Sequence, residues 1–90
     1  MSVTVEIPTP LRGLSGGAAT VAVAGETVRA ALADLISRHP DLGPKLFSGD
    51  ALRPFVNVFV NDEDIRYLDE LDTPVAAGQT VALIPAVAGG

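Results

Sequence analysis

The segment from Val28 to Ile36 constrains the fold most, because its apolar residues repeat with the period of an α-helix. They fall at i, i+3, i+4, i+7 and i+8 and form one continuous stripe: Val28, Ala31, Leu32, Leu35 and Ile36. Thr27 precedes the stripe and can cap the helix by accepting a hydrogen bond from a backbone N–H of the first turn. Pro40 ends the helix, since the residue before a proline disfavours the α conformation. A helix with one apolar face requires a second layer that covers this face.

Two segments before the helix alternate apolar and polar residues, as half-buried β-strands do. The first runs from Val3 to Ile7 and is closed by Pro8 and Pro10. The second runs from Thr20 to Ala24, and we expect it to pair antiparallel with the first. The glycine-containing stretch from Leu11 to Ala18 predicts a connecting loop.

Three further strands are predicted after the helix: Phe55 to Val60, Glu63 to Tyr67 and Thr80 to Ile84. The segment 41–53 that precedes them is irregular, and we expect three apolar side chains to hold it on the core: Leu42, Leu46 and Phe47. The element order β-β-α-β-β-β fits an α+β domain, in which one main helix packs on a mixed sheet of about five strands. We predict that this domain spans residues 1–85.

The composition fits one small globular domain and narrows the classes of function. The chain has 90 residues, of which 48% are hydrophobic, and it has no cysteine, which excludes disulfides, thiolate metal sites and cysteine nucleophiles. It has no apolar run of membrane-spanning length, and its first residues lack the basic and apolar segments of a signal peptide. We therefore expect a cytoplasmic protein that does not enter a membrane.

The formal net charge of −5, from 11 acidic and 6 basic residues, argues against a nucleic-acid partner. Contacts to phosphate groups require clustered Lys and Arg, which this chain does not have. The charge fits a protein partner with a basic face, since complementary charge steers encounter. A solvated acidic surface that aids solubility explains the same charge without any partner.

No group of residues has the pattern of a catalytic, cofactor-binding or metal site. His39, the only histidine, stands at the predicted helix C-terminus, where a cation interacts favourably with the helix dipole. Asp62-Glu63-Asp64 lacks the spacing and the glycine of a calcium loop and is typical of a solvated turn. Ser15-Gly16-Gly17 lacks the lysine of a phosphate-binding loop. We expect that the protein catalyses no reaction by itself and binds no cofactor or metal.

Alternation along the strand from Phe55 to Val60 predicts an apolar patch on one face of the sheet. Phe55, Asn57 and Phe59 share one side of this strand, and we place Ile84 of the last strand beside them. Large apolar residues on an uncovered sheet face mark an interface, so we predict a partner-docking surface there. In the alternative, residues 40–54 fold over these side chains and make them part of the core.

The chain ends on two glycines, and such an end suits a carboxyl group that an enzyme encloses and modifies, because glycine has no side chain. Pro85 cannot donate a hydrogen bond to a strand ladder, so we expect strand pairing to stop there. We expect the residues that follow to form a flexible tail, thin enough to thread into the active site of a partner: Ala86, Val87, Ala88, Gly89 and Gly90. A frayed terminus without a function has the same appearance.

Three segments carry a resemblance to a known family: Val3 to Thr9, Arg53 to Arg66 and Pro85 to Gly90. Together they resemble the ubiquitin-like sulfur-carrier family that includes ThiS and MoaD, and within it the CysO type of actinobacteria. The last two segments are the more specific. The resemblance implies a β-grasp fold. It also implies that Gly90 is the reacting residue, first as an acyl-adenylate and then as a thiocarboxylate.

The resemblance also implies partners. An E1-like adenylating enzyme of the MoeB/ThiF type would use ATP and Mg²⁺ to activate the carboxylate of Gly90, and a sulfur donor would displace AMP. The acceptor would be a pyridoxal-phosphate-dependent cysteine synthase or a thiosugar synthase, and a metalloprotease that releases the product is a further partner.

Three alternatives to this carrier remain open at the level of the sequence. By resemblance to MoaD, the chain would be the small subunit of molybdopterin synthase. A ubiquitin-like protein modifier would use the same Gly-Gly end but join Gly90 to a lysine of a target protein. A plain interaction domain would need the sheet face and not the tail.

Overall fold

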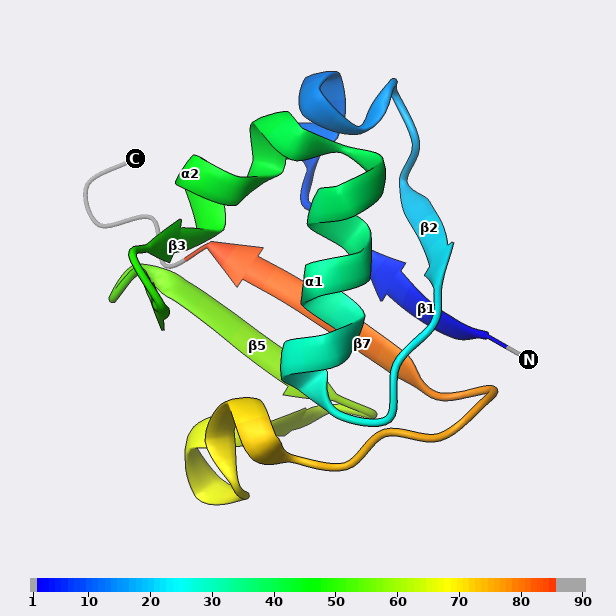
Figure 1. Ribbon diagram of the computed structural model, residues 1–90, viewed down its shortest axis with the longest axis vertical. Helices are drawn as coiled ribbons and strands as arrows, with labels where there is room; N and C mark the ends of the chain where they lie inside the picture. Colours follow the sequence, from blue (N-terminus) through cyan, green and yellow to red (C-terminus); the bar gives the residue numbers. More distant parts are fainter. Residues whose placement is uncertain (1, 86–90) are drawn as a thin grey trace.

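Five strands form one mixed sheet, and a single long helix lies across one of its faces (Figure 1). The computed structural model describes residues 2–85. The elements of this layer pair are β1 (Val3–Glu6), β2 (Thr20–Val23), α1 (Val28–Arg38), β5 (Val56–Val60), β6 (Glu63–Asp64) and β7 (Thr80–Pro85). This arrangement confirms the predicted α+β class.

The strand order β2-β1-β7-β5-β6 places the first and last strands of the domain side by side at the centre of the sheet. β1 pairs antiparallel with β2 and parallel with β7, whereas β5 pairs antiparallel with both β7 and β6. The sheet is therefore mixed, as predicted. The antiparallel pairs β1–β2 and β5–β6 lie at its borders and join strands that follow one another in the sequence. The parallel pair β1–β7 joins the first strand to the last.

Helix α1 follows the predicted apolar stripe and its predicted boundaries. Thr27 caps it, because its Oγ1 accepts a hydrogen bond from the N–H of Ala30 at 3.1 Å. The helix ends at Arg38, two residues before Pro40. Four residues of the stripe are buried against the sheet, Val28, Ala31, Leu32 and Leu35, and Ile36 at its border is half-buried.

Two connecting segments differ from their predicted structure. Residues Thr9–Ser15 form a 3₁₀ helix (η1) where a loop was expected, and the Arg12 Nε–H holds it by donating to the carbonyl of Ile7 at 3.0 Å. The predicted strand from Glu63 to Tyr67 is only the two residues of β6, followed by a 3₁₀ helix, Ile65–Tyr67 (η3). The chain turns there because Asp64 accepts a hydrogen bond from the N–H of Arg66.

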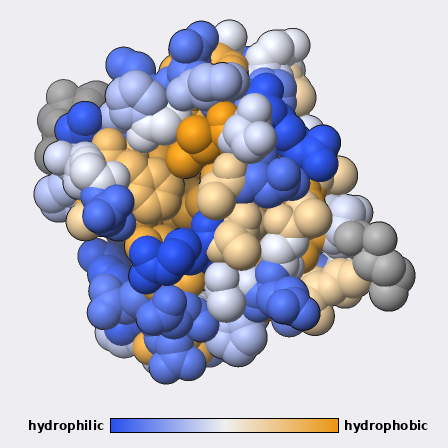
Figure 2. Space-filling view, viewed as in Figure 1, coloured by the Kyte–Doolittle hydropathy of each residue, from blue (hydrophilic) through white to orange (hydrophobic). Residues whose placement is uncertain are grey.

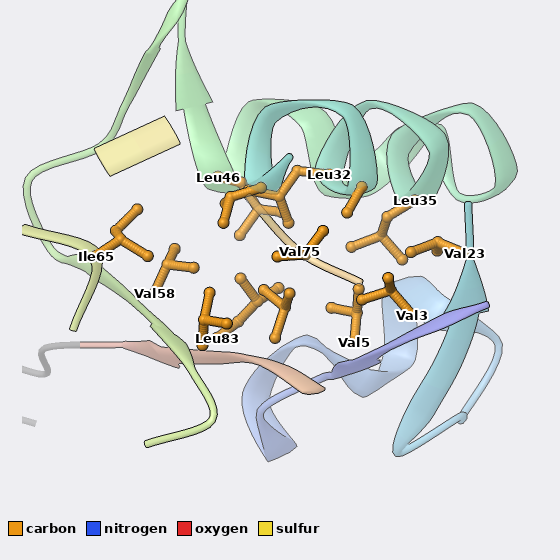
Figure 3. Packing of buried hydrophobic residues seen from close by; sticks show 14 of the residues in the cluster. Val3, Val5, Val23, Leu32, Leu35, Leu46, Val58, Ile65, Val75 and Leu83 are labelled. Atoms are coloured by element: carbon orange, nitrogen blue, oxygen red, sulfur yellow. The ribbon is translucent and has the colours of Figure 1, made fainter. Parts of the chain in front are cut away.

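The segment 40–54 packs on the helix side of the sheet and not on the opposite face. It contains a 3₁₀ helix η2 (Pro40–Leu42), a short helix α2 (Gly43–Leu46) and a small hairpin of β3 (Phe47–Ser48) and β4 (Ala51–Leu52). Leu42 and Leu46 are fully buried, as predicted, and Phe47 packs against the same cluster. Figure 3 shows Leu46 on the same side of the core as Leu32 of α1. The alternative in which this segment covers the outer sheet face is therefore wrong.

A single apolar core lies between α1 and the sheet (Figure 3). The strands contribute valines and leucines from one face only, among them Val3, Val5, Val23, Val58, Val81 and Leu83. Ile65 and Val75 close the core from the segment between β6 and β7. This segment also contains the 3₁₀ helix η4 (Glu70–Asp72). No helix among residues 2–85 is both long and apolar enough to cross a membrane.

Candidate functional site

The outer face of the sheet carries the residues that alternation assigned to it. In β5, Val58 and Val60 are buried toward α1, whereas the alternating residues Asn57 and Phe59 are half-buried on the other side. The register of β5 with β7 sets Asn57 opposite Ile84 and Phe59 opposite Ala82. Directly opposed residues share a face of the sheet, so Asn57, Phe59 and Ile84 form one surface, which we call the outer patch.

The outer patch is open to solvent at its centre and at one end. Ile84 is 46% exposed, and Phe55, in the turn just before β5, is 49% exposed. Phe55 thus lies outside the strand in which it was predicted. A hollow beside Ile84 extends the patch across the sheet to Glu6, Pro8 and Arg12. Exposed apolar side chains next to a hollow with both charge signs are suited to bind a protein surface.

The last described residue of the chain lies next to this patch. Pro85 is the last residue of β7 and lies opposite Val56, the first residue of β5. The predicted tail residues, Ala86, Val87, Ala88, Gly89 and Gly90, lie outside the described residues, so their role stays a prediction. In the described part of the chain, the end of β7 thus lies beside the start of β5, next to Phe55.

An ion pair fixes the border of the sheet beside β5. Asp64 of β6 lies opposite Phe59, and its Oδ2 accepts from Nη2 of Arg66 at 2.7 Å. The hydrogen bonds from the side chain and the backbone N–H of Arg66 lower the pKa of Asp64 below its ordinary value of 3.8. Asp64 therefore stays ionised at neutral pH and holds the turn between β6 and η3.

The acidic segment after β5 and the single histidine both have roles in local backbone structure. Asn61 and Asp62 both have positive φ, 48° and 72°, as the hairpin turn between β5 and β6 requires. The N–H of His39 donates to the carbonyl of Leu35 and closes the last turn of α1. Among residues 2–85, no group of three His, Cys, Asp or Glu side chains could hold a metal ion.

Sequence reasoning missed a second hollow, on the helix side. In Figure 2 apolar side chains gather on this face, ringed by hydrophilic residues. The hollow is lined by Ala33 and Ile36 of α1, by Phe47 of β3, and by charged residues that include Arg29 and Arg53. The Nε–H of Arg53 donates to the carbonyl of Pro44 at 2.6 Å. No local pattern could have revealed this hollow, because residues 29–36 and 43–53 form it together and their packing against one another depends on the fold.

The profile of the ThiS family matches residues 5–90, which is nearly the whole chain. The chain belongs to the ThiS family. This assignment confirms the resemblance that the sequence segments carried, and the fold described above is the ubiquitin-like β-grasp of this family's CysO members.

Similarity to individual proteins extends over the full length. The chain is 43% identical over 93 residues to the sulfur carrier protein CysO of Mycobacterium tuberculosis, with 100% of both chains covered. It superposes with a TM-score of 0.92 on a chain of the BexX/CysO complex of Amycolatopsis orientalis, at 44% identity, covering 98% of this chain and 99% of that one. It also superposes on SAMP1 of Haloferax volcanii with a TM-score of 0.85 at 33% identity, with 100% of both chains covered.

Proposed function

We propose that this protein is a sulfur carrier that is loaded and unloaded at the carboxylate of Gly90. The observation that supports this most is the 43% identity to a sulfur carrier protein over the whole of both chains. The match to the family profile also extends to residue 90 and so includes the Gly-Gly end. The protein is then a co-substrate of partner enzymes and not an enzyme itself.

The chemistry takes place in two steps on a partner enzyme. First, an oxygen of the Gly90 carboxylate attacks the α-phosphorus of ATP, pyrophosphate leaves, and an acyl-adenylate forms; Mg²⁺ accompanies the ATP on the enzyme. Second, hydrosulfide attacks the acyl carbon, the bond to AMP breaks with its electron pair leaving on AMP, and a thiocarboxylate and a proton remain. Adenylation is needed because a carboxylate is a poor electrophile until it has a leaving group. Since the reaction uses ATP, we expect the protein to act in the cytoplasm.

The outer patch is the surface we expect partner enzymes to bind. Ile84 and Phe55 lie beside the last residue of β7, and Phe59 lies opposite Ala82 on the same face, so we expect an enzyme docked there to have the tail within reach. Asn57 offers a half-buried amide among them. The tail then threads toward the active site, where glycines at its end leave the backbone accessible.

The loaded carrier delivers sulfide to an acceptor enzyme. The Amycolatopsis orientalis relative was solved in a complex with BexX, which supports direct binding of such a carrier to another protein. For this chain we propose a pyridoxal-phosphate-dependent cysteine synthase or a thiosugar synthase as the acceptor. If the product stays attached to Gly90, a metalloprotease must release it. The activating enzyme is of the MoeB/ThiF type.

The mass of the chain after reaction with an activating enzyme, ATP and a sulfide source tests the proposal. The chain that ends at Gly90 should gain the mass difference between sulfur and oxygen. A variant with one alanine added after Gly90 should gain nothing and should melt at the same temperature. Sulfur loading of the extended chain would refute the proposed site, because the carboxylate would then belong to another residue.

A protein modifier is the second candidate, because the similarity to SAMP1, a small archaeal modifier protein, also covers the whole of both chains. A modifier forms an isopeptide bond between its last glycine and a lysine. Intact protein isolated from the native host separates the two: a free chain with one oxygen replaced by sulfur supports the carrier, and stable conjugates of higher mass support the modifier.

A further inference from the structure

The two edges of the sheet are protected very differently. The β6 edge is only two residues long and both are acidic, Glu63 and Asp64, which is a common protection against unwanted strand pairing. The β2 edge has no such protection, since residues 13–25 contain neither a charged residue nor a proline. β2 forms the other border of the sheet (Figure 1). It is therefore the edge that is open to another strand.

The hydrogen bonds of β1 with β2 show which groups point away from the sheet. The N–H of Ile7 donates to the carbonyl of Ala19 at 2.8 Å. Bonded and non-bonded pairs alternate along an antiparallel ladder, so Val21 and Val23 also bond to β1. The N–H and C=O groups of Thr20 and Ala22 must then point outward, and both residues are exposed.

At both ends of this edge, other groups of the protein form hydrogen bonds with the backbone. At one end, Ser15 accepts from the N–H of Ala18 at 3.2 Å through its carbonyl and donates to the carbonyl of Ala18 at 2.8 Å through its hydroxyl. At the other end, the N–H of Ala24 donates to Oδ2 of Asp34 at 2.8 Å. Between these two positions of the described chain, the outward N–H and C=O groups of Thr20 and Ala22 have no partner.

We propose that a second copy of this chain pairs with this open edge, β2 against β2, around a twofold axis at Val21. In this antiparallel register, Thr20 of each copy bonds with Ala22 of the other, so all four open groups of each copy are satisfied. Val21 lies opposite its counterpart in the close, non-bonded position. Its half-exposed side chain, which already packs against the core, becomes buried there.

Charge favours a second copy at this edge over the charged parts of the surface. Two molecules that each carry a net charge of −5 repel one another, and this repulsion is smaller where the facing surfaces are neutral. The uncharged segment 13–25 is such a strip, and Asp34 beside it is paired with Arg38 at 3.0 Å. The contact involves one short strand from each copy, so the dimer is weak. It leaves Asn57, Phe59 and Ile84 free, because β1 separates β5 and β7 from β2.

Sedimentation equilibrium of the full chain tests the proposal without reference to sulfur chemistry. As the concentration rises from about 10 µM to about 1 mM, a range suited to weak association, the apparent mass should rise from 9.2 kDa toward twice that value. High salt should strengthen the association, because it screens the repulsion between the two acidic molecules. In NMR spectra, the amides of Thr20 and Ala22 should shift with concentration while that of Phe59 does not.

Three variants make the test specific. Ala22→Pro removes an outward N–H without removing a bond to β1, and Ala22→Lys adds a charge on an exposed position of the edge; both should stay monomeric. Ala33→Lys makes the same change in charge on an exposed position of α1 and should still associate. A wild-type chain that stays monomeric at about 1 mM overturns the proposal, even if it binds an extended peptide from another protein. So does a dimer that survives both changes at Ala22.

Discussion

Gly25 shows how a single residue sets the distance between two elements. It lies between β2 and α1, and a Cβ at this position would come within 2.5 Å of the N atom of Ala31 and 2.8 Å of the carbonyl carbon of Ala30. These neighbours are backbone atoms of the helix, which cannot move aside as a side chain would. Glycine is therefore required for the close approach of the chain to α1.

We expect Gly25→Ala to lower the free energy of unfolding by about 1–3 kcal/mol, because the helix must shift to relieve the overlap. Urea denaturation followed by circular dichroism measures this. Gly13→Ala is the control, since nothing lies within 4 Å of a Cβ there. Equal stability of the two variants would show that the helix adjusts to the methyl group at no cost.

Asp64 gives the protein a defined response to acid. Its pKa is lowered by the hydrogen bonds from Arg66, so its interactions stabilise the folded state fully above its ordinary pKa of 3.8. This stabilisation is lost as the pH falls below that value and through the lower pKa of the folded state. Asp34 responds in the same direction, since the N–H of Ala24 and the side chain of Arg38 lower its pKa as well.

We expect Asp64→Asn to be less stable than wild type at neutral pH, with a difference that shrinks and vanishes as the solution is made strongly acidic. Asparagine retains an oxygen that can accept from the N–H of Arg66 but loses the charge. Urea unfolding at a series of pH values from neutral to about 2 measures both proteins. Because Asp34 is present in both, a difference that does not change with pH would contradict the assignment to Asp64.

At the scale of an element, strand β5 separates buried from partly exposed side chains by simple alternation. Val58 is 1% exposed and faces α1, whereas its neighbour Phe59 faces the outer side. The adjacent β6 and β7 hold this strand in place along both edges. Adjacent residues of the same strand should therefore respond to the same substitution in opposite ways.

We expect Val58→Asp to unfold the domain, because burying an unpaired carboxylate costs several kcal/mol, a large part of a total stability of about 5–15 kcal/mol. Phe59→Asp should leave the melting temperature within a few degrees of wild type but weaken binding to the activating enzyme about tenfold or more. Thermal melts and binding titrations of the two variants decide this. If Phe59→Asp unfolds the protein as Val58→Asp does, the outer patch is core and not a docking surface.

At the scale of the whole molecule, the segment 40–54 covers one face of the sheet together with α1 and leaves the other face uncovered. It adds α2 and the β3–β4 hairpin to the helix side, where Leu42 and Leu46 complete the core. The opposite face keeps exposed apolar side chains at Phe55 and Ile84. One face is thus packed in the core, and the other keeps apolar side chains exposed to solvent.

We expect Leu46→Ala to lower the free energy of unfolding by about 2–5 kcal/mol, because it leaves a cavity in the core. Phe55→Ala removes a larger side chain but should change the free energy of unfolding by less than about 1 kcal/mol, since much of this side chain is already in water. Chemical denaturation of both variants measures the contrast. Comparable losses would mean that the two faces contribute equally to stability.

The amino-acid sequence by itself determined the elements whose signals are local. The stripe from Val28 to Ile36 predicted α1 with its cap at Thr27, and alternation predicted which side of β5 is buried. These predictions succeeded because the periods of 3.6 and 2 residues follow from backbone geometry within one element. The family resemblance rested on segments of the same local kind, and the family profile confirmed it. The exposure of the outer patch at Phe55 and Ile84 was also within reach of the sequence, although its function remains a prediction.

Only the tertiary structure decided what depends on contacts between distant segments. It placed segment 40–54 on the helix side, turned the predicted strand after Glu63 into η3 through the bonds of Asp64 with Arg66, and closed the ends of the β2 edge with Ser15 and Asp34. None of these follows from a period in the sequence. Each depends on which groups still lack a hydrogen-bond partner or a covering layer once the sheet has formed, and this is a property of the folded chain.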